Sequence, residues 1–160
     1  MTTPRVSNPF KAAPEAYQAM MKLEQAIAAS GLEHSLLELL RTRVSQINGC
    51  AHCLHMHTTD ARKAGESEMR LYLLSAWRES SAFTDRERAA LGWAEALTLV
   101  SQTGAPDADY EALKAQFSET EQVNLTFAIG SINTWNRLAV GFRLAHPAVA
   151  APQAVDAVAA

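Results

Sequence analysis

The sequence has few cysteines and little net charge, and each shortage argues against one class of protein. It has two cysteines in 160 residues, and they lie together as Cys50 and Cys53. Secreted domains that depend on disulfides usually carry several cysteines spread along the chain, so this class is excluded. A net charge of −3 argues against a nucleic-acid binder, because contacts to phosphates need clustered basic side chains.

Long uninterrupted apolar runs are also missing. Residues 1–18 contain none, so we do not expect a secretory signal there. The most apolar later stretch, 123–142, has the length of a membrane span, but three asparagines and Arg137 interrupt it. We therefore expect a cytoplasmic protein with no membrane partner. In that compartment a Cys-x-x-Cys pair is usually redox-active or metal-binding.

Proline is absent between residues 15 and 105, which leaves room for consecutive helices, because proline disrupts helix interiors. Apolar side chains recur at helical spacing, and no segment shows the alternation typical of a strand. Thr84 with Glu87 and Ser118 with Glu121 form capping-box patterns, each of which predicts a helix start. The expected helices cover about 14–30, 33–46, 50–65, 69–76, 84–100, 107–117 and 118–144. The sequence predicts an all-α fold, a compact bundle of about six to seven helices.

We expect a single domain over 1–160, with a core at about 14–145 and a loosely ordered tail at 146–160. The final helix is apolar nearly all round and should be buried on all sides. A subunit interface would bury it, so we expect a homo-oligomer; a central helix in a monomer is the alternative. Asn133 and Asn136 interrupt this helix and, because buried amides need partners, should fix helix packing or a subunit contact.

A short segment around the two cysteines has the residue types of a reactive site. On a helix, Cys50, Cys53 and His57 share one face, whereas His52 and His55 fall on the opposite, more polar face. His57 lies one turn after Cys53 and can serve as the base for its thiol. Cys50 is close enough for a disulfide with Cys53 and lies near the positive end of the helix dipole. A nucleophilic thiol, a base and a resolving thiol are the parts of a thiol peroxidase or a disulfide reductase.

Together with Glu38 these residues resemble the motif of the AhpD alkylhydroperoxidase family, in the carboxymuconolactone decarboxylase superfamily. The motif is a glutamate, eleven residues, Cys-x-x-Cys, three residues and a histidine, and it spans 38–57. The likeness in helix pattern extends over roughly 20–100, and stretches 73–79 and 132–137 are similar as well. The resemblance implies a helical bundle that assembles into trimers or hexamers.

The resemblance also implies roles for the site residues. Cys53 would be the peroxidatic thiol that attacks a small hydroperoxide, and Cys50 would resolve the sulfenic acid to a disulfide. His57 would deprotonate Cys53, Glu38 would orient His57 or relay protons, and His52 stands where the family has a histidine tied to proton transfer. No bound cofactor and no metal are implied. The electrons would come from an external dithiol, either a partner protein or a small thiol.

Other interpretations use the same residues. The pair could serve a disulfide reductase or redox sensor, or the chain could be a decarboxylase of the same superfamily, although that chemistry needs no paired thiols. Cys50, Cys53, His57 and Glu38 are also acceptable zinc ligands, and a structural disulfide is a further alternative, although so short a loop stabilises little. Taken alone, Glu38 predicts a solvated carboxylate paired with Arg41; only the family spacing places it in the site.

Overall fold

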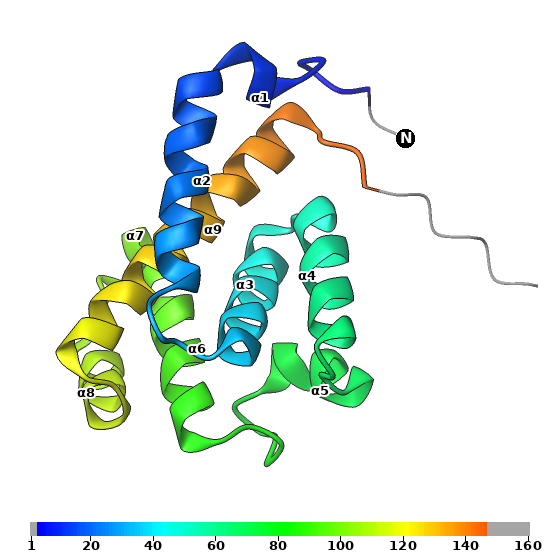
Figure 1. The fold of residues 1–160 in the computed structure, drawn as a ribbon. Helices are drawn as coiled ribbons and strands as arrows, with labels where there is room; N and C mark the ends of the chain where they lie inside the picture. The colour runs from blue at the N-terminus through cyan, green and yellow to red at the C-terminus, as the bar shows by residue number, and fades with distance from the viewer. Residues whose placement is uncertain (1–2, 147–160) are drawn as a thin grey trace, which may run out of the picture.

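The structure, a computed structural model, describes residues 3–146, and every regular element in that range is a helix (Figure 1). The elements are α1 (Pro9–Ala12), α2 (Pro14–Ala28), α3 (His34–Asn48), α4 (Ala51–Lys63), α5 (Glu68–Leu73), the 3-10 turn η1 (Leu74–Ala76), α6 (Asp85–Thr98), α7 (Val100–Thr103), α8 (Asp107–Gln116) and α9 (Glu119–Phe142). The all-α prediction is confirmed. The expected segments are all present, and the described residues add α1 and α7, which are too short to produce a periodic pattern.

α3 is the central helix, and α4, α6 and α9 pack against it (Figure 1). Its apolar stripe, which includes Leu40 and Val44, joins side chains of α6 and α9 in the larger core. Leu39 points away from that stripe and packs with Trp77 in a second apolar cluster. Because neighbours cover α3 on more than one side, polar side chains on it are buried as well, Glu38 among them.

Both predicted capping boxes are present and begin the helices that the sequence assigned to them. Thr84 caps α6 with Glu87, and Ser118 caps α9 with Glu121. The amide of Ser118 and the guanidinium of Arg86 lower the pKa of Glu121 to about 2, so this cap stays ionised at neutral pH.

The turn between α3 and α4 delivers the cysteine pair to the start of a helix. Gly49 ends α3 in the left-handed conformation, with φ +65°, which favours glycine. Cys50 follows immediately as the N-cap of α4. The turn is fastened to α9 because Asn48 donates to both Asn133 and Asn136, at 3.0 and 2.8 Å.

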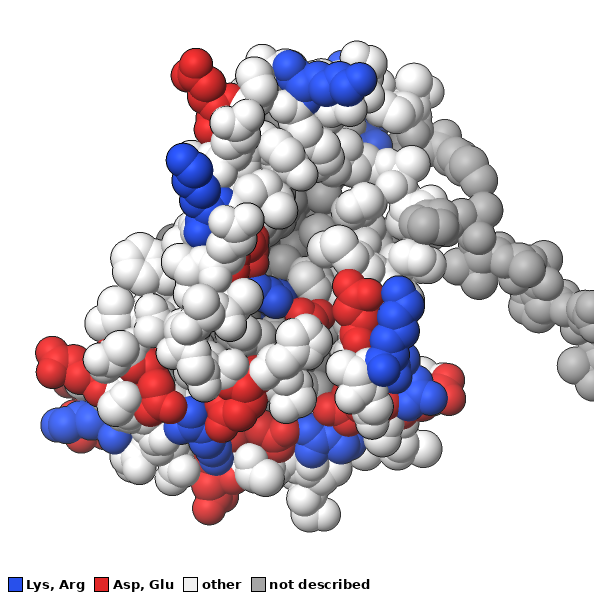
Figure 2. Space-filling view, viewed as in Figure 1, with Lys and Arg blue, Asp and Glu red and all other residues white. Residues whose placement is uncertain are grey.

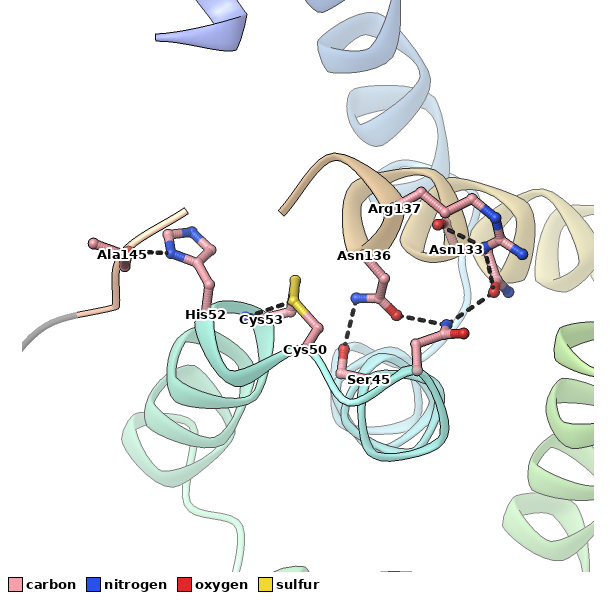
Figure 3. The surroundings of a disulfide bond; sticks show 9 residues. Ser45, Cys50, His52, Cys53, Asn133, Asn136, Arg137 and Ala145 are labelled. Carbon is pink, nitrogen blue, oxygen red and sulfur yellow. Dashed lines mark hydrogen bonds between the residues drawn. A yellow bond between two sulfur atoms is a disulfide. The ribbon is translucent and has the colours of Figure 1, made fainter. Parts of the chain in front are cut away.

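Asn136 is 1% exposed and donates in turn to Ser45 Oγ at 3.1 Å, as Figure 3 shows. The expectation that the two asparagines of α9 fix helix packing is therefore confirmed. Their contacts hold the end of α3, and with it the cysteine turn, against α9.

Within the single chain α9 is not buried on all sides, so the alternative of a central helix in a monomer is wrong. Val123 and Phe127 remain 51% and 54% exposed, because α2, α3, α4, α6 and α8 cover only part of the helix. The oligomer that would cover the rest stays a prediction. Of the expected loose tail, 147–160 lie outside the described residues. None of the helices between residues 3 and 146 has the length and hydropathy that crossing a membrane requires.

Candidate active site

Cys50 and Cys53 form a disulfide at the N-terminus of α4, beside the end of α9 (Figure 3). The side chains are almost inaccessible, at 1% and 2% exposure, and pack with Ala139 of α9. The backbone N–H of Cys53 donates to the sulfur of Cys50 at 3.3 Å. Cys50 thus occupies the position where backbone amides and the helix dipole favour negative charge, which stabilises a thiolate when the pair is reduced.

A cavity of about 390 Å³ lies against Cys53. Cys53 forms part of its wall, whereas Cys50 is not among the lining residues, so the cavity distinguishes the two thiols. The wall is largely apolar: it includes Phe10, Tyr17, Met21, Met56, Ile132, Trp135, Leu138, Ala139 and Leu144. In the space-filling view a hollow lies between α2 and α4, with uncharged atoms above it and acidic and basic side chains along its lower edge (Figure 2).

His57 and Glu38 meet on the polar side of this cavity. His57 Nδ1 lies 2.8 Å from Glu38 Oε2, and the two residues are 8% and 4% exposed. An ionised carboxylate can only accept, so Nδ1 carries the hydrogen and the other ring nitrogen, Nε2, is left as the basic one in neutral imidazole. Within residues 3–146 no hydrogen bond engages Nε2. Nε2 of His57 is therefore available as a base on the wall of the cavity that Cys53 also lines.

The prediction of a solvated Glu38 from its helix position alone is wrong, because α4 covers that face of α3. The predicted pair with Arg41 is present, with Nη1 of Arg41 2.8 Å from Oε1 of Glu38. Burial raises the pKa of Glu38, but the hydrogen bond from His57 and the ion pair with Arg41 outweigh it and hold the pKa below its usual 4.5. Glu38 thus stays ionised at neutral pH and orients the imidazole.

The predicted separation of His52 from Cys53 on opposite faces of α4 also needs correction. It lines the cavity together with Cys53, although a helical wheel puts the two side chains on opposite faces. The cavity extends around the side of α4 that carries His52 and Met56, because the segment after α9 crosses there. The ring atom Nδ1 of His52 lies 2.7 Å from the carbonyl oxygen of Ala145 (Figure 3). His55 is not among the lining residues.

The sequence analysis gave no role to several polar residues of the cavity wall, Glu24 and Trp135 among them. Glu24 receives Arg41 Nη2 at 2.7 Å and Trp135 Nε1 at 2.9 Å. Neither shares the Cys-x-x-Cys segment or its helix, so local spacing carries no signal for them. For the zinc alternative, no three metal-binding side chains within residues 3–146 are grouped so that they could hold an ion.

Comparison with known proteins identifies a family that this chain matches and relatives with similar sequences. The model of the carboxymuconolactone decarboxylase family matches residues 14–96. The uncharacterized protein YdfG of Bacillus subtilis (strain 168) is 40% identical over 131 residues, covering 82% of this chain and 89% of that protein.

Two solved structures resemble the whole fold. ATU0492 of Agrobacterium tumefaciens, a protein of unknown function provisionally assigned as the antioxidant defence protein AhpD, is 51% identical with a TM-score of 0.88. The alignment covers 92% of this chain and 100% of that one. An uncharacterized peroxidase-related protein of Ralstonia eutropha JMP134, described as an AhpD core, has 20% identity and a TM-score of 0.76, covering 91% and 77%. This second likeness shows the fold alone.

Proposed function

The chain belongs to the carboxymuconolactone decarboxylase family and has an AhpD-like fold, and from that membership we propose that it is a thiol-dependent peroxidase. Its substrates are small hydroperoxides, and an external dithiol supplies the electrons. The observation that carries the proposal is the asymmetry of the thiol pair: Cys53 lines the cavity that also contains His57 and Glu38, while Cys50 is excluded from it.

The first step is attack by the Cys53 thiolate on the outer oxygen of the hydroperoxide. The O–O bond breaks, Cys53 becomes a sulfenic acid, and an alkoxide leaves. His57 takes the proton of the thiol through Nε2 and passes it to the alkoxide, so the product is an alcohol. Glu38, bonded to Nδ1, stabilises the imidazolium that exists between these two transfers.

In the second step Cys50 attacks the sulfenic sulfur and forms the disulfide. Hydroxide leaves and, with the proton of the Cys50 thiol, becomes water. A dithiol donor then attacks Cys53, the sulfur on the cavity wall, and Cys50 leaves as a thiolate stabilised by the amide of Cys53. The donor closes its own disulfide, so two electrons enter for each hydroperoxide. We propose a cytoplasmic setting, where such donors are kept reduced. His52 completes the site as a second proton-transfer group on the cavity wall.

Treating the reduced protein with one equivalent of tert-butyl hydroperoxide tests this cycle. We expect the intact mass to fall by two hydrogens within seconds, as the Cys50–Cys53 disulfide forms, and C50S to gain one oxygen instead. Rapid-quench mass spectrometry measures both. If Cys53 reacts no faster than free cysteine, the peroxidase assignment is wrong, and a disulfide reductase or redox sensor becomes the better explanation of the pair.

We further propose that the protein is a homo-oligomer, a trimer or hexamer, assembled through the exposed side of α9. Val123 and Phe127 lie one turn apart there and border a groove with Trp93 and Tyr110. A second copy of the chain would remove this apolar surface from water.

F127E should therefore dissociate the assembly, raising the dissociation constant at least about 30-fold, because truncating a central interface aromatic typically costs about 2 kcal/mol or more. Sedimentation velocity measures the change. M69E on α5, an apolar position that is exposed to a similar extent at 61%, serves as the control and should leave the assembly intact. A monomeric wild-type protein, or an F127E variant that still assembles, would contradict the proposal.

A further inference from the structure

Glu24 on α2 is a carboxylate of the cavity wall to which the proposed cycle gives no role. It accepts hydrogen bonds from Arg41 Nη2 at 2.7 Å, from Trp135 Nε1 at 2.9 Å and from the hydroxyl of Ser131. Its side chain is 22% exposed. These donors belong to α3 and α9, so Glu24 connects three helices at the cavity that Cys53 also lines.

Arg41 is shared between two carboxylates. Nη1 donates to Oε1 of Glu38 at 2.8 Å, and Nη2 donates to Oε2 of Glu24 at 2.7 Å. A guanidinium that faces one carboxylate often binds both of its oxygens at once. Because Nη2 of Arg41 is bound to Glu24, the guanidinium contacts only one oxygen of Glu38. The second oxygen, Oε2, is left for Nδ1 of His57.

We propose that Glu24 is a positioning residue for the thiol chemistry. By binding Nη2 of Arg41, it leaves Oε2 of Glu38 to bind His57, the base for Cys53. The inference rests on the proposed function for the identity of the reacting thiol. Without the Glu24 carboxylate, Arg41 can bind both oxygens of Glu38 with Nη1 and Nη2, and so compete with the imidazole of His57 for Oε2.

The charges of the cluster agree with this arrangement. Ionised Glu24 and Glu38 with Arg41 sum to one negative charge, which the imidazolium formed during the reaction neutralises. α9 contributes only the uncharged donors Ser131 and Trp135 to Glu24. The other titratable side chains on the cavity wall are Tyr17, His52 and Asp60, and within residues 3–146 none of them bonds to this cluster.

The test measures thiol reactivity without peroxide. In a C50S background Cys53 is the sole thiol, and serine is itself a good N-cap for α4. We expect E24Q to slow alkylation of Cys53 by iodoacetamide about 3–10-fold at pH 7, and to shift the pH profile of the rate upward by about half a unit to one unit. E15Q, which removes an exposed carboxylate from the same helix, should leave the profile unchanged.

Coupling through Arg41 separates positioning from a direct effect of charge. In an R41M background, E24Q should cause no further slowing. An equal effect of E24Q with and without Arg41, or an unshifted profile for E24Q, would overturn the inference. If E24Q does not fold, R41K gives the same test, because lysine keeps the charge but cannot bridge two carboxylates as a planar fork does; an R41K profile like that of the wild type would then overturn it.

The outcomes of the two proposals are distinct. A reduced wild-type protein that ignores hydroperoxides would contradict the peroxidase proposal, whereas the alkylation profile of E24Q would still report on Glu24. An unshifted E24Q profile would remove the role of Glu24 and leave peroxide turnover untouched.

Discussion

Cys53→Ser is expected to abolish dithiol-dependent hydroperoxide turnover, lowering it by at least about three orders of magnitude, because the reacting sulfur is removed. The substitution exchanges one buried atom next to Ala139 and leaves the N-cap of α4 unchanged, so the fold should persist. Loss of tert-butyl hydroperoxide with dihydrolipoamide as the donor measures the rate. Undiminished turnover would exclude Cys53 as the attacking thiol.

Cys50→Ser is the matched control, because it removes the other half of the same disulfide. Without the dithiol donor it should still reduce one equivalent of hydroperoxide and then stop as the sulfenic acid of Cys53, which dimedone traps. The two variants therefore differ in kind as well as in rate: one has no first step, and the other has no second step. A sulfenic acid found on Cys50 in the C53S protein would reverse the proposed order of attack.

Much of this site follows from the sequence because its central residues are close together along one helix. Cys50, Cys53 and His57 fall on one face of α4 by spacing alone, and all three are buried there. The capping boxes of α6 and α9 were predictable for the same reason, since each depends on four consecutive residues.

The remainder depends on which helix covers which face, and periodicity carries no such information. The polar neighbours of Glu38 on its own helix predict a solvated carboxylate, yet the packing of α4 buries it. His52 reaches the cavity because residues after α9 cross α4, far along the chain. Glu24 meets Trp135 across 111 residues, a pairing that only the tertiary fold creates.

The second large effect is expected at the Glu38–His57 pair. E38Q removes the charge that orients and stabilises the imidazole, and H57Q removes the base; each should slow oxidation of Cys53 by hydroperoxide about 10²–10⁴-fold. Since the two residues act as one unit, the double variant should be little slower than H57Q alone. Stopped-flow oxidation of the reduced proteins between pH 5 and 9 measures these rates.

Glu38 should also contribute to stability in a pH-dependent way. Its pKa is depressed in the folded protein, because the bonds from His57 and Arg41 outweigh the effect of burial. The contribution is therefore complete above the unfolded pKa of about 4.5 and is lost as the pH falls through the lower folded value. Urea unfolding should show E38Q less stable than wild type at pH 7, by about 1–3 kcal/mol, with the difference shrinking below pH 4.5.

Glu95 provides the control that separates catalysis from stability. It is another carboxylate whose pKa is lowered, because bonds from Trp77, Arg78 and Arg43 outweigh its burial, and it is not among the residues of the cavity wall. E95Q should lose stability with the same sign of pH dependence but oxidise Cys53 at the wild-type rate. If E95Q slows the thiol as much as E38Q does, the loss reflects a weakened fold, and Glu38 has no special link to His57. A slow E38Q beside a fast E95Q would instead tie the reactivity of Cys53 to the one carboxylate that contacts its base.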